Sequence, residues 1–138
     1  MSVDEQKVRE AHGAFYEAVS DRDMDAMEEI WARKAPVSCI HPGWSLLLGR
    51  DMVLSSWRSI LEGPAAPEIA VSREAVHVYG DTAVVLCVES LVDGQLMATN
   101  VLIREPGGWK FVHHQAGPIS MAIEFEDDDD EPPPGLLN

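Results

Sequence analysis

The second half of the chain is a regular series of apolar segments separated by strong turn signals. The segments cover residues 69–79, 82–92, 95–105 and 109–117. Between them lie Gly80-Asp81, Asp93-Gly94 and Pro106-Gly107-Gly108, which are combinations that close tight turns between neighbouring strands. Strands joined by such short turns pair antiparallel. The pattern therefore predicts a four-stranded antiparallel meander.

The first half of the chain shows the period of amphipathic helices instead. Ser2 and Glu5 have the spacing of a capping box, and the apolar residues that follow recur at helical spacing up to about residue 20. A shorter helix is predicted after Asp23 and a third over 50–61, with a short extended segment at 36–40 between them. Helices followed by a meander predict an α+β fold, with the helices packed on one face of a curved sheet.

Length and charge limit the kind of protein this is. A chain of 138 residues is long enough for one domain with a single core. Seven acidic residues lie in 124–131, so half of the net charge of −14 comes from this stretch. We predict a domain over 1–123 and a solvated, Pro-rich tail over 124–138. The remainder is still acidic, which argues against a nucleic-acid partner.

Apolar runs and cysteine usage indicate a compartment. The apolar runs are too short to span a bilayer, and the charged first ten residues do not resemble a secretory signal. Cys39 and Cys87 both lie in strand-like apolar runs, so buried free thiols are favoured over a disulfide. We therefore expect a cytoplasmic protein that is not bound to a membrane.

Neither a metal nor a cofactor is expected. The five histidines are scattered without the spacing of a zinc site, and there is no Cys-x-x-Cys. The glycines lie in turns rather than in a phosphate-binding loop.

One strand carries an unusual stripe of side chains. Alternation places Trp109, Phe111, His113 and Gln115 on one face of the last strand and His114 on the other. Two aromatic groups followed by two polar groups suit a pocket that is apolar at one end and polar at the other. A core histidine bonded to one neighbour is the equal alternative for His113. The segment 39–44, Cys-Ile-His-Pro-Gly-Trp, has the same mixed character.

These segments carry a resemblance to a known family. Cys39 to Trp44, Gly49-Arg50 before Trp57, Thr99-Asn100-Val101, and Trp109 with 112–115 together resemble the nuclear-transport-factor-2-like (NTF2-like) superfamily, and within it the SnoaL-like group. The likeness covers residues 5–120. It implies a cone-shaped fold with three N-terminal helices on a strongly curved antiparallel sheet. It also implies a pocket between the sheet and the helices, and an outer sheet face that pairs two subunits.

The ketosteroid-isomerase branch of that superfamily suggests roles for individual residues. Its general-base aspartate falls on His41, which precedes Pro42, and its mid-sheet protonated aspartate falls on Asn100. Its tyrosine on the first helix falls on Phe15 and not on Tyr16. The resemblance therefore implies a base at His41 and one amide donor at Asn100, with the second donor missing.

Other polar and aromatic residues are further candidates. A buried Asn100 must be hydrogen-bonded, and Glu89 would need a partner if buried but could equally face solvent. Trp44 and Trp57 are either core residues or flank the pocket mouth. Arg50 begins a helix, where a cation opposes the helix dipole, so we expect an anion or a carboxylate to hold it.

The sequence thus predicts a homodimer that binds a small, mostly apolar ligand. Its ligand-binding residues would be Trp44, Trp57, Glu89, Asn100, Trp109, Phe111, His113 and Gln115. His41 would act as the base in isomerase- or cyclase-type proton transfer. The alternative is a non-catalytic dimerisation or ligand-sensing module, with the acidic tail as a contact element.

Overall fold

The computed structural model describes residues 2–64 and 66–120. The predicted acidic tail, 124–138, and its boundary lie outside the described residues. The helices are α1 (Val3–Ser20), α2 (Met24–Ile30) and α3 (Arg50–Glu62). The strands are β1 (Ser38–Ile40), β2 (Leu47–Leu48), β3 (Ala70–Tyr79), β4 (Thr82–Leu91), β5 (Gly94–Glu105) and β6 (Gly108–Pro118).

The helices begin where the local sequence predicts. The Ser2 hydroxyl accepts the backbone N–H of Glu5 at 3.0 Å, and the Asp23 carboxylate accepts that of Ala26 at 3.1 Å. Both bonds satisfy backbone donors that the first turn of a helix leaves free. Among the described residues, none of the helices combines the length and apolar character needed to cross a membrane.

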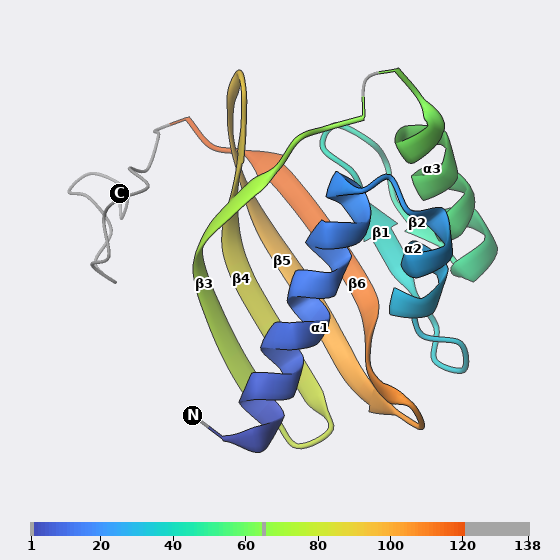
Figure 1. Cartoon of the computed structure of the whole chain (residues 1–138), viewed down its shortest axis with the longest axis vertical. Coiled ribbons are helices and arrows are strands. Elements are labelled where there is room, and N and C mark those ends of the chain that lie inside the picture. Colours follow the sequence, from blue (N-terminus) through green and yellow to red (C-terminus); the bar gives the residue numbers. More distant parts are fainter. Residues whose placement is uncertain (1, 65, 121–138) are drawn as a thin grey trace.

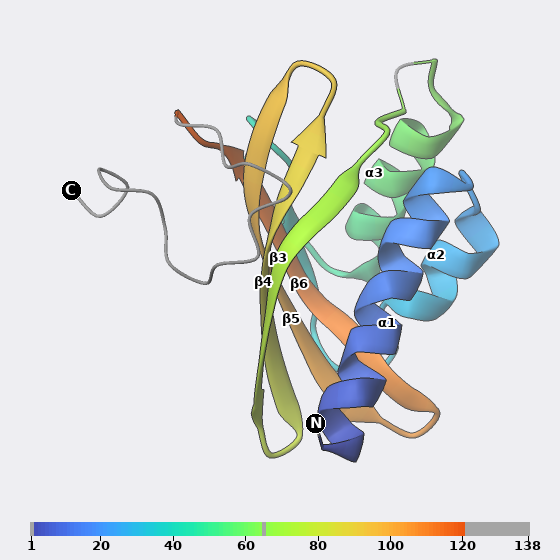
Figure 2. The same cartoon turned by 60° about the vertical axis from the view of Figure 1, so that its left-hand side comes forward.

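The strands form one six-stranded sheet in the order β2-β1-β6-β5-β4-β3. The predicted meander is confirmed, since β3 to β6 pair antiparallel in sequence order. The expectation of a wholly antiparallel sheet is wrong at one place, because β1 pairs parallel to β6. All three helices lie on one side of this sheet (Figures 1 and 2). We call the sheet face under the helices the inner face and the opposite one the outer face.

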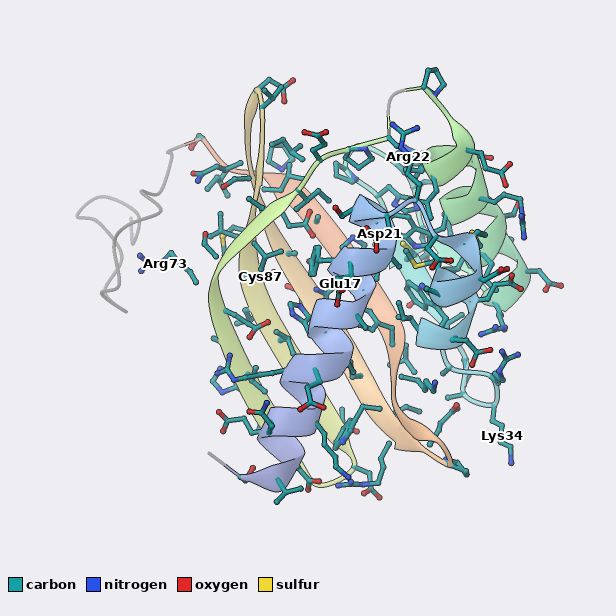
Figure 3. The ribbon with its side chains drawn as sticks, viewed as in Figure 1. Glu17, Asp21, Arg22, Lys34, Arg73 and Cys87 are labelled. Carbon is teal, nitrogen blue, oxygen red and sulfur yellow. The ribbon has the colours of Figure 1, made fainter. Side chains whose placement is uncertain are left out.

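Two irregularities break the alternation of the meander. In β3 the register shifts between Ser72 and Ala75. Arg73 has a φ of 54°, and its side chain extends away from β3 (Figure 3). In β6 the partners of Val101 and Leu102 are His113 and Phe111, so Val112 is an extra residue. Bulges of this kind change the face to which the following side chains point.

The core fills the space between the inner face and the helices. Phe15 of α1 stacks on Phe111 of β6 with ring centroids 4.6 Å apart. Its edge meets Trp57 of α3 at 5.3 Å. All three side chains are buried. This packing fixes α1 and α3 over the half of the sheet that carries the buried polar residues described next.

Candidate functional site

Buried polar side chains gather on the inner face between α1, α3 and the sheet. They come from separate elements, namely His12 (α1), Ser56 (α3), Glu89 (β4), Asn100 (β5) and His114 (β6), together with His41 directly after β1. The partly buried Tyr16 of α1 joins them through its hydroxyl. Beside them the inner face carries the small side chains of Cys87, Ala98 and Ala116, which form a separate buried cluster that Tyr16 packs against. Buried polar groups must be paired to be tolerated, so the hydrogen bonds between them define the site.

Asn100 lies at the centre of this polar cluster and is fully buried. Its amide nitrogen lies 2.9 Å from Nε2 of His12 and 3.1 Å from the hydroxyl of Tyr16. Its amide oxygen accepts a hydrogen bond from Nδ1 of His114 at 2.5 Å. The two N–H groups and the carbonyl of the amide all have partners. Asn100, on β5, therefore links two side chains of α1 to one of β6.

His12 connects Asn100 to the protein surface. Nδ1 of His12 lies 2.6 Å from Oε2 of Glu74, and the other oxygen of Glu74 pairs with Arg9. The bond from His12, followed by Arg9, lowers the pKa of the Glu74 carboxyl against the opposing effect of burial. Glu74 therefore stays ionised and accepts hydrogen bonds from both side chains.

Tyr16 and Glu89 form a second branch of the cluster. The Tyr16 hydroxyl lies 2.6 Å from Oε2 of Glu89 and 3.4 Å from Sγ of Cys87. Burial raises the pKa of Glu89, and the bond from Tyr16 offsets only part of that effect. Burial also raises the pKa of Tyr16, so the phenol stays protonated. A buried carboxyl with a raised pKa beside a phenol is an arrangement found at acid–base sites.

His41 faces the same region from the end of β1. Its Nε2 lies 2.8 Å from the Ser56 hydroxyl, and its ring meets the rings of Trp57 and Trp44 edge-on, each at 4.8 Å. Burial lowers the pKa of His41 to about 4. Its ring centroid is 6.4 Å from that of His114. Burial, and behind it the neighbouring histidines, lowers the pKa of His114 to about 3. Both imidazoles are thus neutral at neutral pH.

The structure corrects the predicted orientation of the two adjacent histidines. His114 is 3% exposed and joins the cluster on the inner face. His113 points to the outer face, where its Nδ1 bonds to the Ser38 hydroxyl at 2.7 Å. Gln115, which alternates with His114, is exposed on the outer face too. The extra residue Val112 is the cause, because it shifts the alternation by one position after Phe111.

The other predicted site residues fall into two groups. Trp57, Glu89 and Asn100 line the buried cluster, and Trp44 covers one edge of His41 while remaining 47% exposed. Trp109 and Phe111 are part of the packed core, and Trp109 stacks under the guanidinium of Arg104 at 4.6 Å. The predicted stripe therefore does not line one pocket.

Two hollows lie at the surface near these residues. One of about 520 Å³ runs along α3 and is lined by Trp44, Asp51, Met52, Ser55, Ser56 and Ser59. Another of about 320 Å³ lies where α1 and α2 meet the start of β6, beside Trp109. Within the described residues, no three side chains of the metal-binding types gather closely enough to hold an ion.

Sequence reasoning missed several members of the cluster. His12, Ser56 and Glu74 were not predicted, although His12 has helical spacing to the core residues Val8 and Phe15. Tyr16 was set aside in favour of Phe15, yet it is the Tyr16 hydroxyl that contacts Asn100 and Glu89. The sequence signal that could have identified Tyr16 was its position on the first helix, directly after the core aromatic Phe15. The structure thus brings a tyrosine hydroxyl into the cluster from a position to which the resemblance assigned no role.

Comparison with known proteins agrees with this architecture. A "putative dehydratase" of the NTF2-like family from Streptomyces avermitilis is 36% identical, with a TM-score of 0.79 over 86% of this chain and 97% of that one. A "putative calcium/calmodulin-dependent protein kinase type II association domain" from Thiobacillus denitrificans is 32% identical, with a TM-score of 0.71 over 80% and 93%.

Sequence comparison extends the likeness to plants and identifies the family. F-box protein SKIP8 of Arabidopsis thaliana is 30% identical over 104 residues, which cover 74% of this chain and 45% of SKIP8. The chain thus spans less than half the length of this relative. The family model for the SnoaL-like domain matches residues 8–124. The chain therefore belongs to the SnoaL-like domain family and has its NTF2-like fold.

Proposed function

We propose that this SnoaL-like protein binds a small, largely apolar molecule against the inner face and transfers a proton on it. The observation that carries the proposal is the hydrogen-bonded group of Tyr16, Glu89, Asn100 and His114 beside the small side chains of Cys87, Ala98 and Ala116. A mostly apolar surface with a few convergent polar groups and shifted pKa values is characteristic of ligand sites.

Tyr16 would supply the donor for an oxygen that gains charge. When Glu89 is protonated, its carboxyl can donate to the Tyr16 oxygen, which also accepts from Asn100. The phenol proton is then free to bond to a ligand carbonyl. A donor placed where negative charge develops is worth roughly 3–4 kcal/mol in a water-excluded site.

His41 remains the proposed base. Its neutral ring could take a proton from a carbon next to a ligand carbonyl, while the electron pair moves to the oxygen that Tyr16 contacts. As the electron pair returns from the oxygen, His41 could give the proton to another carbon, which would complete an isomerisation. Alternatively, it could give the proton to a hydroxyl group on the next carbon, which leaves as water when its carbon–oxygen bond breaks, and this would complete a dehydration. The 36% identity with a protein described as a putative dehydratase supports testing the second outcome.

A thermal-shift screen of small carbonyl and polycyclic compounds would test binding, and the hits would then be assayed for turnover. We expect Tyr16→Phe and His41→Ala each to lower turnover by about 10²-fold while binding persists. Tyr79→Phe, at a tyrosine that is 65% exposed, is the matched control. If His41→Ala and Tyr16→Phe change only affinity, the protein is a binding module.

A non-catalytic association module is the second candidate. The relative described as an association domain supports it, as do the apolar side chains of the outer face described below. For either function we propose a homodimer formed through that face. The free, buried thiols of Cys39 and Cys87 support a cytoplasmic setting, since reducing compartments keep cysteines unpaired.

A further inference from the structure

A chain of hydrogen bonds runs from the protein surface to His114. It passes from Glu74 on β3 through His12 on α1 and Asn100 on β5 to His114 on β6. Glu74 is partly exposed, with a side-chain accessibility of 24%, whereas the other three members are buried. Each contact is 2.9 Å or shorter, so the chain is continuous.

The chemistry of the groups fixes where each proton lies. The Glu74 carboxylate can only accept, so Nδ1 of His12 donates to it. Nε2 of His12 then accepts an N–H of Asn100, and the second N–H of the amide goes to Tyr16. The amide oxygen can only accept, so Nδ1 of His114 carries the ring proton. Nε2 of His114 is therefore unprotonated. It can therefore accept a hydrogen bond.

The hydrogen bond between His41 and Ser56 likewise fixes the ring tautomer of His41. The Ser56 hydroxyl donates its single proton to the backbone carbonyl of Val53 at 2.7 Å. It can therefore only accept from Nε2–H of His41. Nδ1 of His41 is left as the nitrogen that carries the acceptor electron pair, and the Cys39 sulfur lies 3.9 Å from it.

We infer that Glu74, His12 and Asn100 are positioning residues that set the ring tautomer of His114, and that His114 presents Nε2 as an acceptor to a hydroxyl or N–H group of the ligand. The inference rests on the proposed function, to which it adds a substrate class. Tyr16 offers a donor and His114 an acceptor, so the ligand that fits both is a small hydroxycarbonyl compound.

The tautomer can be measured on the free protein. In ¹⁵N-labelled full-length chain at pH 7, we expect long-range ¹H–¹⁵N spectra to show His114 with a protonated Nδ1 and a bare Nε2. Glu74→Leu should shift the His114 signals towards a mixture of tautomers. Glu74→Gln should preserve them, because the Gln carbonyl can still accept from His12. A wild-type His114 protonated at Nε2, or spectra that do not differ between the Leu and Gln variants, would overturn the positioning role. Should Glu74→Leu not fold, the wild-type and Gln spectra still decide the tautomer.

The ligand class is tested separately with matched probes. We would compare 3-hydroxyacetophenone with 3-methoxyacetophenone, and 2-naphthol with 2-methoxynaphthalene, by calorimetry. The loss of one hydrogen bond to a buried acceptor predicts about tenfold weaker binding of each ether. The hydroxyketone should bind more tightly to wild type than to Tyr16→Phe, whereas 2-naphthol should not. Equal binding of phenols and ethers would overturn the substrate class while leaving the binding function standing. If no probe binds although the tautomer is as inferred, the proposed binding function fails instead.

Discussion

At the scale of single residues, Asn100 is the group on which the buried cluster depends. It is the only described side chain that bonds to His12, Tyr16 and His114 together. Removing a partner from a buried polar group costs the desolvation of that group without compensation, about 1–3 kcal/mol each. Networks of this kind also lose more than one bond when their centre is removed.

We therefore expect Asn100→Ala to lower the free energy of unfolding by about 3 kcal/mol or more. Thr99→Ala, at the neighbouring exposed position on the outer face, should change it by less than about 0.5 kcal/mol. Urea denaturation of both variants measures the difference. A loss below about 1 kcal/mol for Asn100→Ala would show that the cluster contributes little to folding.

The buried histidines also predict how stability depends on pH. The pKa values of His41 and His114 are lowered to about 4 and about 3, whereas an unfolded histidine has a pKa of 6.5. Between pH 6.5 and 4 the unfolded chain therefore binds protons that the folded protein does not. Stability must fall as the pH drops through this range, by up to about 1.4 kcal/mol per pH unit for each histidine. Glu89 acts in the opposite direction above pH 4.5, because its pKa is raised.

Melting temperatures recorded from pH 7.5 to 4.5 would test this dependence. We expect a steady decrease below pH 6.5 in the wild type and a shallower one in His114→Gln, whose amide can still donate to Asn100. His77→Gln replaces an exposed histidine of β3 and should leave the slope of the wild type unchanged. A His114→Gln slope equal to that of the wild type would contradict the lowered pKa.

At the scale of elements, Arg50 connects α3 to α2. Its guanidinium donates to the backbone carbonyl of Glu28, in the last turn of α2, and to those of Trp31 and Ala32, which directly follow that helix. The carbonyls of a last helical turn lack partners within the helix. We expected an anion or a carboxylate to hold Arg50. Its partner is instead the C-terminal end of α2, where the helix dipole favours a cation. This contact holds α3, and with it Ser56 and Trp57, against the rest of the helical layer.

Arg50→Met keeps the length of the side chain and removes its charge. We expect it to cost roughly 1.5–3 kcal/mol of stability, the range for hydrogen bonds to charged groups. The matched control is Arg58→Met in the same helix, because Arg58 is half exposed and its ion pairs with Glu28 and Glu62 lie at the surface. Such pairs contribute less than about 1 kcal/mol. Equal costs in chemical denaturation would mean that capping of α2 is unimportant.

At the scale of the whole molecule, the outer face of the sheet has the character of an interface. None of the three helices covers it (Figure 2). By alternation it carries the apolar side chains of Val84, Leu86, Met97, Val101 and Ile103. Met97 is 42% exposed, and the other four are partly exposed. Contiguous apolar surface of this kind marks protein–protein contacts more often than free surface.

We expect light scattering to show a dimer at tens of micromolar and Val101→Lys to shift it to monomer, because the change places a charge in the centre of the contact. Met52→Lys, on the exposed side of α3, should leave the dimer intact. The melting temperature of the wild type, but not of Val101→Lys, should rise with protein concentration. A wild-type monomer at that concentration would rule out the proposed contact.

The sequence by itself determined the features that depend on neighbouring residues. Ser2 and Asp23 begin their helices through bonds to a backbone N–H three positions on. Gly80, Gly107 and Gly108 adopt the positive φ angles that tight turns require. Turn and cap chemistry act within a few residues, so the order of helices and the antiparallel meander could be predicted.

Only the tertiary structure decided which polar groups meet. The parallel pairing of β1 with β6 sets Cys39 opposite His114 and so brings His41 to the inner face. The extra residue at Val112 exchanges the faces of His113 and His114, and the irregularity after Ser72 precedes Glu74, which reaches His12. Strand register is fixed by pairing between segments distant in sequence, and a shift of one residue reverses every following side chain. Local periodicity therefore predicted the strands but not the members of the site.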